Sequence, residues 1–365
     1  MDDRLLRPEE RAVLALRGLY RQHGYRPFKM SKFEEYELYA RNKDFLQSDR
    51  VITFTDSGGR LLALKPDVTL SIVKKGEDGP GRKQKLCYDE SVFRPAASTG
   101  SFREITQAGL ECIGDLDGYD VYEAVCLAAQ SLGLIAESYV LEVNHLGLLT
   151  SLLDGLHPTP SLRRQLARCL AGKNRHDLRR LGGENGLDGA LLDRLEAVAA
   201  VYDAPEAALE RLRGCGVDGA ALEELEALAG LLNENGLAEH VVFDGALVCD
   251  LQYYNGVVFR GYLPGVAEEV LSGGQYDRLL ARMGRSARAV GFALYLDRLE
   301  ALDRTAEPFD VDVLLLYTEQ DSTAAVARAV RALVDAGRSV SAEKRIPEKL
   351  RYRELRRLGK EAGRC

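Results

Sequence analysis

The stretch KLCYDESVFRPAASTGSFREITQAGLE, residues 85–111, predicts the element around which the rest of the chain is organised. Turn-forming Pro, Ser and Gly residues gather in its middle, over residues 95–100, and strand-forming residues lie on both sides. We therefore expect an antiparallel hairpin whose first strand ends at Arg94 and whose second strand begins near Phe102.

The second strand of this hairpin carries polar side chains on one face. Arg103, Gln107 and Glu111 share that face with Gly109, because successive side chains point to opposite sides of a strand. An arginine matches an anionic group, and an amide and a carboxylate match an ammonium group. The face is interpreted as part of a site for a small zwitterion or a phosphate. An exposed sheet surface is the open alternative.

The composition is that of a folded protein of about two or three domains. The 365 residues exceed one typical domain, 46% of them are hydrophobic and 29% are charged. The net charge of −7 argues against binding of nucleic acid through overall charge. The seven cysteines form no C-x-x-C pair, so no metal site is expected. No signal peptide and no apolar run of roughly 20 residues is found, so we expect a cytoplasmic protein without a membrane partner.

The first part of the chain alternates between helix and strand patterns. Apolar residues at helical spacing predict a helix over residues 8–23, and residues 25–33 are interpreted as a strand. A Gly-Gly turn between two short apolar runs predicts a second hairpin over residues 51–64. An amphipathic helix over residues 120–132 and a strand over residues 138–143 follow.

Strand patterns disappear over residues 146–239, where Leu-, Ala-, Glu- and Arg-rich stretches alternate with Gly, Asn and Pro. This segment predicts a helical insertion within an α+β core of residues 1–307. Residues 308–365 predict a small α/β unit that ends in a basic helix over residues 347–362. We interpret that helix as a solvated surface element, and contact with nucleic acid is the open alternative.

Three further motifs carry groups suited to a ligand site. The LKPDVT motif contains Asp67 and Thr69, which also suit the start of a helix. The LVCDLQYYNGVVF motif contains Tyr253 and Tyr254, whose rings and hydroxyls suit an imidazole or, alternatively, a protein core. The SGGQYD motif, residues 272–277, has glycines that permit close approach of the backbone.

Together these motifs resemble the class II aminoacyl-tRNA synthetases in their histidyl form, over about residues 5–305. The central hairpin resembles the second class II motif, and VGFALYLDRL, residues 290–299, resembles the third. The motifs around Asp67 and Tyr253 resemble the histidine-specific segments. The resemblance implies an α+β, class II synthetase-like fold, in which helices flank an antiparallel sheet and an N-terminal helix and strand form a dimer.

The resemblance also implies roles for individual residues. No catalytic residue, metal ligand or cofactor is expected. Residual nucleotide- or anion-binding residues are expected to be Arg94, Arg103 and Arg298. Histidine-binding residues are expected to be Asp67, Thr69, Gln107, Glu111, Tyr253 and Tyr254.

Several groups that a working synthetase needs are replaced in this chain. The resemblance places Ala96 at the position of an ATP-binding glutamate and Ile105 at that of a phenylalanine that packs on adenine. It places Cys249 at the position of a catalytic arginine. Removing one charged contact to a transition state costs roughly 10²–10³ in rate, so three replacements together argue against aminoacylation.

A chain that keeps the amino-acid groups and loses the ATP groups resembles the synthetase-like regulatory subunits of ATP phosphoribosyltransferase. The resemblance implies a non-catalytic subunit that binds histidine and activates and feedback-regulates a short catalytic subunit in the first step of histidine biosynthesis. It also implies a homodimer within a hetero-oligomer, and tRNA is not expected as a partner. Three alternatives stay open: an active or diverged histidyl-tRNA synthetase, an RNA-binding adaptor with a basic tail, and a nucleophilic role for Cys249.

Overall fold

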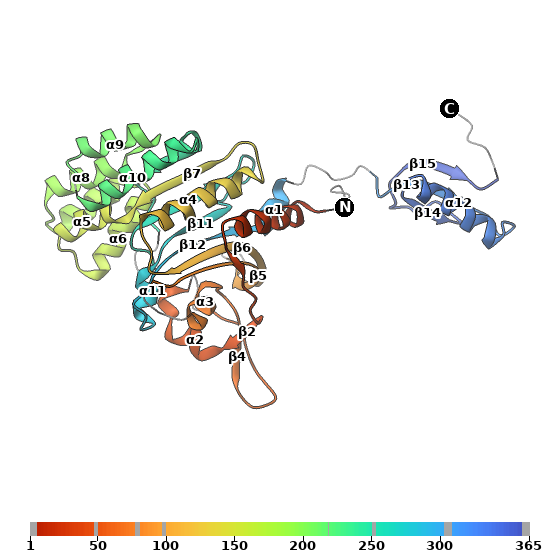
Figure 1. Ribbon diagram of the computed structural model, residues 1–365, viewed down its shortest axis with the longest axis horizontal. Helices are drawn as coiled ribbons and strands as arrows, with labels where there is room; N and C mark the ends of the chain where they lie inside the picture. The colour runs from red at the N-terminus through yellow and green to blue at the C-terminus, as the bar shows by residue number, and fades with distance from the viewer. Residues whose placement is uncertain are drawn as a thin grey trace. The chain divides into compact units, whose positions relative to one another are not determined.

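The computed structural model describes residues 6–46, 50–76, 81–96, 100–217, 219–249, 253–302 and 309–359. The chain divides into a large unit, residues 1–302, and a small unit, residues 303–365 (Figure 1). The predicted boundary at residues 307–308 lies outside the described residues. None of the helices found among the described residues is long and apolar enough to cross a membrane.

A nine-stranded mixed sheet forms the centre of the large unit. In the strand order given in the next sentence, neighbours are antiparallel from β5 to β7. Strand β1 is parallel to β5, and β9 is parallel to β7. The strands lie in the order β1 (Arg26–Pro27), β5 (Lys83–Pro95), β6 (Phe102–Gly114), β12 (Arg288–Tyr295), β11 (Leu271–Gln275), β10 (Val257–Tyr262), β7 (Val140–His145), β9 (Val241–Asp244) and β8 (Tyr202–Asp203).

The predicted central hairpin is confirmed. Strands β5 and β6 have 13 residues each and pair antiparallel along their whole length. The pairing runs from Lys83 opposite Gly114 at the base to Pro95 opposite Phe102 at the tip. The hairpin therefore supplies two adjacent strands, and residues 107–113 of β6 are buried inside the unit.

Helices α1 (Pro8–Gln22) and α4 (Gly118–Gly133) pack against one face of the sheet, as Figure 1 shows, and both were predicted. Leu110 and Cys112 of β6 are fully buried in the core that these helices complete. Because side chains alternate along a strand, Gln107 and Glu111 project from the opposite face. The sheet thus separates an apolar core from the predicted ligand site.

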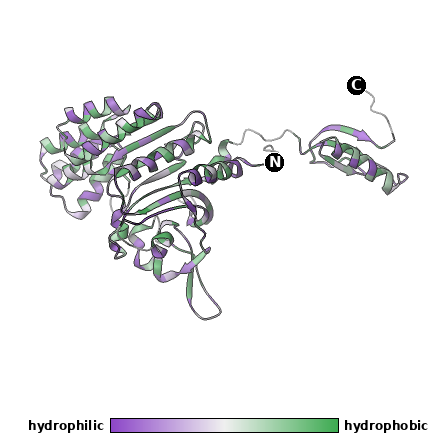
Figure 2. Cartoon of the chain, viewed as in Figure 1, coloured by the Kyte–Doolittle hydropathy of each residue, from purple (hydrophilic) through white to green (hydrophobic). Residues whose placement is uncertain are grey.

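Six helices occupy residues 146–234, where a helical insertion was expected, and β8 lies among them. Several begin with a side-chain cap, since Thr159, Asn174 and Asp188 each accept a hydrogen bond from a backbone N–H of the first turn. Hydrophobic and hydrophilic residues alternate along these helices (Figure 2). The helices are α5 (Leu146–Gly155), α6 (Pro160–Ala171), α7 (Arg175–Glu184), α8 (Gly189–Ala199), α9 (Pro205–Gly214) and α10 (Ala220–Glu234).

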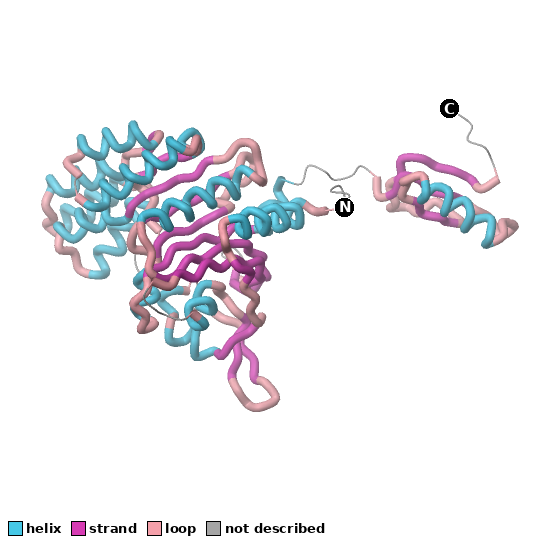
Figure 3. Tube along the Cα trace, in the orientation of Figure 1, coloured by secondary structure: helices cyan, strands magenta, loops and turns pink. Residues whose placement is uncertain are grey.

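The second predicted hairpin is confirmed as part of a small three-stranded sheet (Figure 3). Its turn is held by Asp56, whose carboxylate accepts hydrogen bonds from the backbone of Gly58 and Arg60. Gly59 has a φ of +79°, a conformation that favours glycine. The strands lie in the order β2 (Phe33–Glu35), β4 (Leu61–Leu64) and β3 (Thr53–Thr55).

The interpretation of residues 25–33 as one strand is wrong. Only Arg26 and Pro27 pair with the edge of the sheet, and the chain leaves it after the Phe28 N–H donates to the Cys87 carbonyl. Proline has no N–H to continue a ladder, so pairing here is confined to an edge. The remaining short elements of this unit are α2 (Tyr36–Arg41), η2 (Lys43–Phe45), α3 (Thr69–Lys75), η3 (Ala238–His240), α11 (Asp277–Arg282) and η4 (Leu296–Leu302).

The C-terminal unit contains a parallel three-stranded sheet and one helix, and the predicted helix over residues 347–362 is wrong. Residues Tyr352–Arg357 form β15, which pairs with β13 (Val311–Leu316), and residues 360–365 lie outside the described residues. The segment is extended because the backbone of β13 supplies its hydrogen-bond partners, which helical propensity does not reveal. Helix α12 (Thr323–Asp335) and strand β14 (Val340–Glu343) complete the unit.

Candidate functional site

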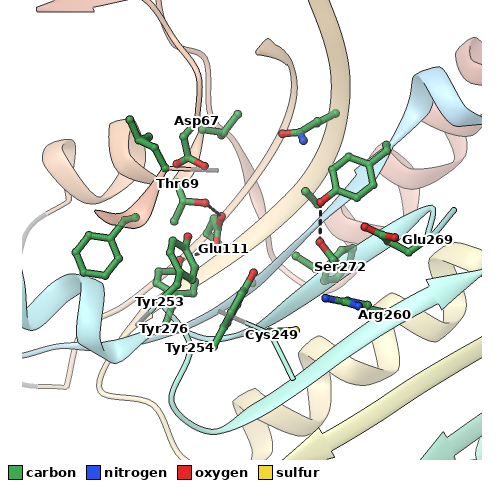
Figure 4. A pocket seen from close by; sticks show the side chains of 18 of the residues that line it. Asp67, Thr69, Glu111, Cys249, Tyr253, Tyr254, Arg260, Glu269, Ser272 and Tyr276 are labelled. Carbon is green, nitrogen blue, oxygen red and sulfur yellow. Dashed lines mark hydrogen bonds between the residues drawn. The ribbon is translucent and has the colours of Figure 1, made fainter. Parts of the chain in front are cut away.

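A cavity of about 200 Å³ lies over the face of the sheet opposite α1 and α4 (Figure 4). Its floor is formed by strands β6, β12, β11 and β10. Its walls come from the start of α3, from Arg94 of β5 and from Tyr253 and Tyr254, which precede β10. Side chains from segments that are far apart in the sequence therefore meet in one cavity.

Two glycines keep the floor of this cavity open. Glu111 of β6 pairs with Gly291 of β12, which in turn pairs with Gly274 of β11. A Cβ atom on Gly291 would lie 1.8 Å from Oε2 of Glu111, so only glycine lets this carboxylate lie across β12. Gly274 has a φ of +156°, and a Cβ atom there would lie 3.0 Å from the ring of Tyr254. Both positions require glycine.

Glu111 is the most completely held polar group of the cavity. It is 2% exposed, and its two oxygens accept hydrogen bonds from different elements. The Thr69 hydroxyl donates to Oε1 over 2.7 Å, and the Tyr276 hydroxyl donates to Oε2 over 2.5 Å. Burial raises the pKa of Glu111 to about 8, although both hydrogen bonds lower it. A cationic ligand group beside this carboxyl would favour its ionised form.

Asp67 supplies a second carboxylate and also contacts the first turn of α3. Its Oδ1 accepts a hydrogen bond of 2.8 Å from the backbone N–H of Leu70. The Arg94 guanidinium lies 3.6 Å from Oδ2, and Nε of Arg94 donates to the carbonyl of Pro66 over 2.6 Å. Burial raises the pKa of Asp67, and the charge of Arg94 opposes that rise. Arg94 therefore positions both Asp67 and the turn before α3.

Aromatic rings form one wall of the cavity. The ring centroids of Tyr253 and Tyr254 are 4.6 Å apart, and those of Tyr253 and Tyr276 are 5.7 Å apart. Phe45 packs edge-on against Tyr253 at 5.9 Å. Such a wall suits a flat, partly polar ring, because it offers both apolar faces and hydroxyls.

The far end of the cavity has a different character. Ser272 and Tyr295 share a hydrogen bond of 2.7 Å, and Arg260 and Glu269 lie beside them (Figure 4). Cys249 also reaches the cavity, from an apolar cluster in which it is buried. One end of the cavity thus carries Asp67, Glu111 and Arg94 beside the aromatic wall, and the other end carries Arg260 and Glu269.

The cavity brings together all six residues that were predicted to bind histidine. Of the three predicted anion-binding arginines, Arg94 lines the cavity and the other two do not. Arg103 is exposed on β6, opposite Arg94 in the hairpin. Arg298 forms ion pairs of 2.9 Å with Glu268 and 3.5 Å with Glu269, and stacks on the ring of Tyr295. The six residues are Asp67, Thr69, Gln107, Glu111, Tyr253 and Tyr254.

Other lining residues were not singled out from the sequence. Arg260 lies just after the tyrosine motif, two residues beyond the buried Val258. Because side chains alternate along a strand, this spacing could have placed Arg260 on the same face as Val258. The contact between Tyr276 and Glu111 had no such signal, because it joins residues 165 positions apart. Gln252 of the same motif lies outside the described residues.

No group of three or more potential metal ligands occurs in the part of the chain that the structure describes. The polar groups of the cavity are instead three carboxyl groups, an amide, hydroxyls and guanidinium groups. This set suits an organic zwitterion, which carries both an ammonium and a carboxylate.

Comparison with known proteins shows the family of this chain. The family model for histidyl-tRNA synthetase matches residues 3–299. The ATP phosphoribosyltransferase regulatory subunit of Moorella thermoacetica is 31% identical over 348 residues, which cover 92% of this chain and 89% of that protein.

Two solved structures share the fold. A crystal structure of an ATP phosphoribosyltransferase regulatory subunit/histidyl-tRNA synthetase from Bacillus halodurans superposes with a TM-score of 0.74 at 24% identity, covering 96% of this chain and 93% of that one. The ATP phosphoribosyl transferase (HisG:HisZ) complex from Thermotoga maritima contains a chain with a TM-score of 0.63 at 20% identity, covering 81% of this chain and 97% of that one.

The fold and the site define a class II aminoacyl-tRNA synthetase-like protein of the histidyl type, which confirms the predicted fold class. Within that class, the chain belongs to the family of ATP phosphoribosyltransferase regulatory subunits, as the resemblance of its motifs predicted.

Proposed function

We propose that this chain is a non-catalytic regulatory subunit that binds histidine and controls a short ATP phosphoribosyltransferase catalytic subunit. The observation that carries the proposal is the hydrogen-bonded Glu111, held by Thr69 and Tyr276 in the cavity that Asp67 also lines. Two carboxyl groups suit the ammonium and imidazole of histidine, and the tyrosine wall suits a flat ring. Gln107, which is 2% exposed, adds an amide to the same cavity.

The groups that would bind and activate ATP are replaced or engaged elsewhere. Ala96, Ile105 and Cys249 stand where the resemblance expects a glutamate, a phenylalanine and an arginine. Arg298, the arginine of the third motif, does not line the cavity and is paired with Glu268 and Glu269. A free cation stabilises the negative charge that develops on a phosphate during the reaction. An arginine that is already paired with carboxylates does this poorly. This arrangement favours a ligand-binding role over aminoacylation.

The partner is proposed from the family. The Moorella relative is named as a regulatory subunit, and the Thermotoga neighbour comes from a complex named HisG:HisZ. We propose that this chain forms a homodimer within such a hetero-oligomer. Regulation by histidine then requires histidine to bind the inhibited form of the complex more tightly than the active form, since coupling between two sites is reciprocal.

The direct test is phosphoribosyl-ATP formation by the short catalytic subunit of the same organism, with and without this chain, over a titration of histidine. Activation by this chain that histidine reverses is the expected result. A catalytic subunit whose rate is the same with and without this chain would overturn the proposal.

The second candidate function is a histidyl-tRNA synthetase, which the family model supports. It predicts histidine-dependent exchange of pyrophosphate into ATP by this chain alone. The regulatory proposal predicts no exchange above a control without histidine. The same assay on an active histidyl-tRNA synthetase establishes that exchange is detectable.

A further inference from the structure

Arg260 is a cavity residue to which neither the motifs nor the comparisons give a role. It lies on β10, opposite Ser272 of β11, which is opposite Ala293 of β12. These three paired residues lie two positions away, along their strands, from the paired residues Glu111, Gly291 and Gly274. Arg260 therefore projects from the same sheet face as Glu111, three strands away.

Arg260 forms no ion pair within 4 Å among the described residues, although Glu142 of β7 lies directly opposite it in the sheet. The titratable groups that interact with its guanidinium are Cys249, Tyr262, Glu269 and Glu142. The carboxylate of Glu269 is engaged by Arg298 at 3.5 Å. A partly buried guanidinium without a paired anion is costly, so the site is suited to receive one from a ligand.

The spacing between Arg260 and Glu111 fits a small zwitterion. Strands β6 and β10 are about 14 Å apart, since three spacings of about 4.8 Å separate them. The Glu111 carboxylate lies across β12, because it occupies the space over Gly291. The carboxylate and the long arginine side chain therefore bracket a gap over Ala293 and the two glycines, which have little or no side chain to fill it.

We propose that Arg260 binds the α-carboxylate of the amino-acid ligand, while Asp67 and Glu111 hold its cationic groups. The inference rests on the proposed histidine site and adds the residue that would distinguish an amino acid from its uncharged derivatives. A guanidinium can bind a carboxylate through two parallel N–H donors, which a lysine cannot reproduce.

The test compares L-histidine with L-histidinamide, which keeps the ammonium and imidazole groups but has no carboxylate. Calorimetry on the full chain is expected to give tighter binding of histidine than of histidinamide. Arg260→Gln is expected to weaken histidine binding at least tenfold and to change histidinamide binding less than twofold. Arg260→Lys keeps the positive charge and is expected to fall between the wild type and Arg260→Gln.

Arg164→Gln, at an exposed position of α6, is the matched control and should change neither affinity. An Arg260→Gln variant that binds both ligands as the wild type does, or loses both equally, would overturn the role of Arg260 and leave the histidine site standing. A wild-type chain that binds neither ligand would overturn the histidine site itself, and the role of Arg260 with it. Thermal unfolding of each variant verifies that it is folded.

Discussion

The Tyr276 hydroxyl donates a hydrogen bond of 2.5 Å to Oε2 of Glu111, and this bond joins the residue before α11 to strand β6. The two residues are 165 positions apart, and both are almost fully buried. The bond aims the carboxylate across the floor of the cavity, where Gly291 leaves room for it. The site therefore depends on the pairing of β6 with β12 as much as on the hairpin that carries Glu111.

The raised pKa of Glu111 predicts a specific dependence of stability on pH. The pKa of Glu111 is about 8 in the folded protein, whereas the ordinary value for a solvated glutamate is 4.5. As the pH rises, the unfolded chain therefore loses this proton before the folded protein does. The free energy of unfolding should fall by up to about 1.4 kcal/mol per pH unit between these two values. Urea denaturation of wild type and Glu111→Gln at pH 5 to 8 measures this contribution.

Glu111→Gln should show a shallower decline with pH over that range, because its amide does not titrate. Glu104→Gln, on the exposed part of the same strand, is the matched control and should retain the wild-type slope. Equal slopes for wild type and Glu111→Gln would contradict the raised pKa.

Glu111→Ala should weaken histidine binding by at least roughly tenfold, since a hydrogen bond to a charged group contributes about 1.5–3 kcal/mol. Calorimetric titration of the wild type and the variant with histidine measures the change. Glu104→Ala is the control and should bind histidine like the wild type. An unchanged affinity in Glu111→Ala would remove Glu111 from the proposed site.

Breaking the buried ion pair between Lys65 and Glu90 by removing one partner should be strongly destabilising. Lys65 Nζ lies 2.5 Å from the Glu90 carboxylate, and the lysine side chain is 0% exposed. Lys65→Met should lower the free energy of unfolding by about 3–5 kcal/mol, because it leaves a buried carboxylate without its partner. Urea denaturation provides the measurement.

The double variant Lys65→Met/Glu90→Met should recover most of that loss, since both charges are then removed together. Arg41→Met, which breaks an exposed pair with Glu37, is the control and should leave stability unchanged within error. Additive losses in the double variant would argue that the two side chains are not coupled.

Arg94→Ala should leave the chain folded, as expected for a cavity residue, but should lower its melting temperature. The variant loses the hydrogen bond to the Pro66 carbonyl and the charge that opposes the raised pKa of Asp67. The pKa of Asp67 should rise further, so histidine affinity should fall more steeply below neutral pH than in the wild type. Calorimetry at pH 6 and pH 8 measures this difference.

Arg103→Ala is a close control, because Arg103 lies opposite Arg94 in the hairpin but is exposed outside the cavity. It should retain the wild-type affinity at both pH values. If Arg103→Ala and Arg94→Ala behave alike, Arg94 has no particular role at the site.

Local sequence pattern was sufficient where neighbours along the chain decide the structure. The turn residues between two strand-forming runs predicted the β5–β6 hairpin, and alternation along β6 placed Gln107 and Glu111 on one face. Helical spacing predicted α1 and α4. The motifs also identified all six residues that meet in the cavity, because each lies in a short segment whose residue types are specific.

Only the tertiary structure decided which distant residues meet and which charges are paired. The strand β15 forms because β13 supplies its hydrogen-bond partners, although its sequence suggested a helix. Arg298 is paired with Glu268 and Glu269, whereas Arg260 enters the cavity through the register of β10. A local pattern fixes the face on which a side chain lies, but strand order and burial arise from contacts between distant segments, and these determine what the side chain touches.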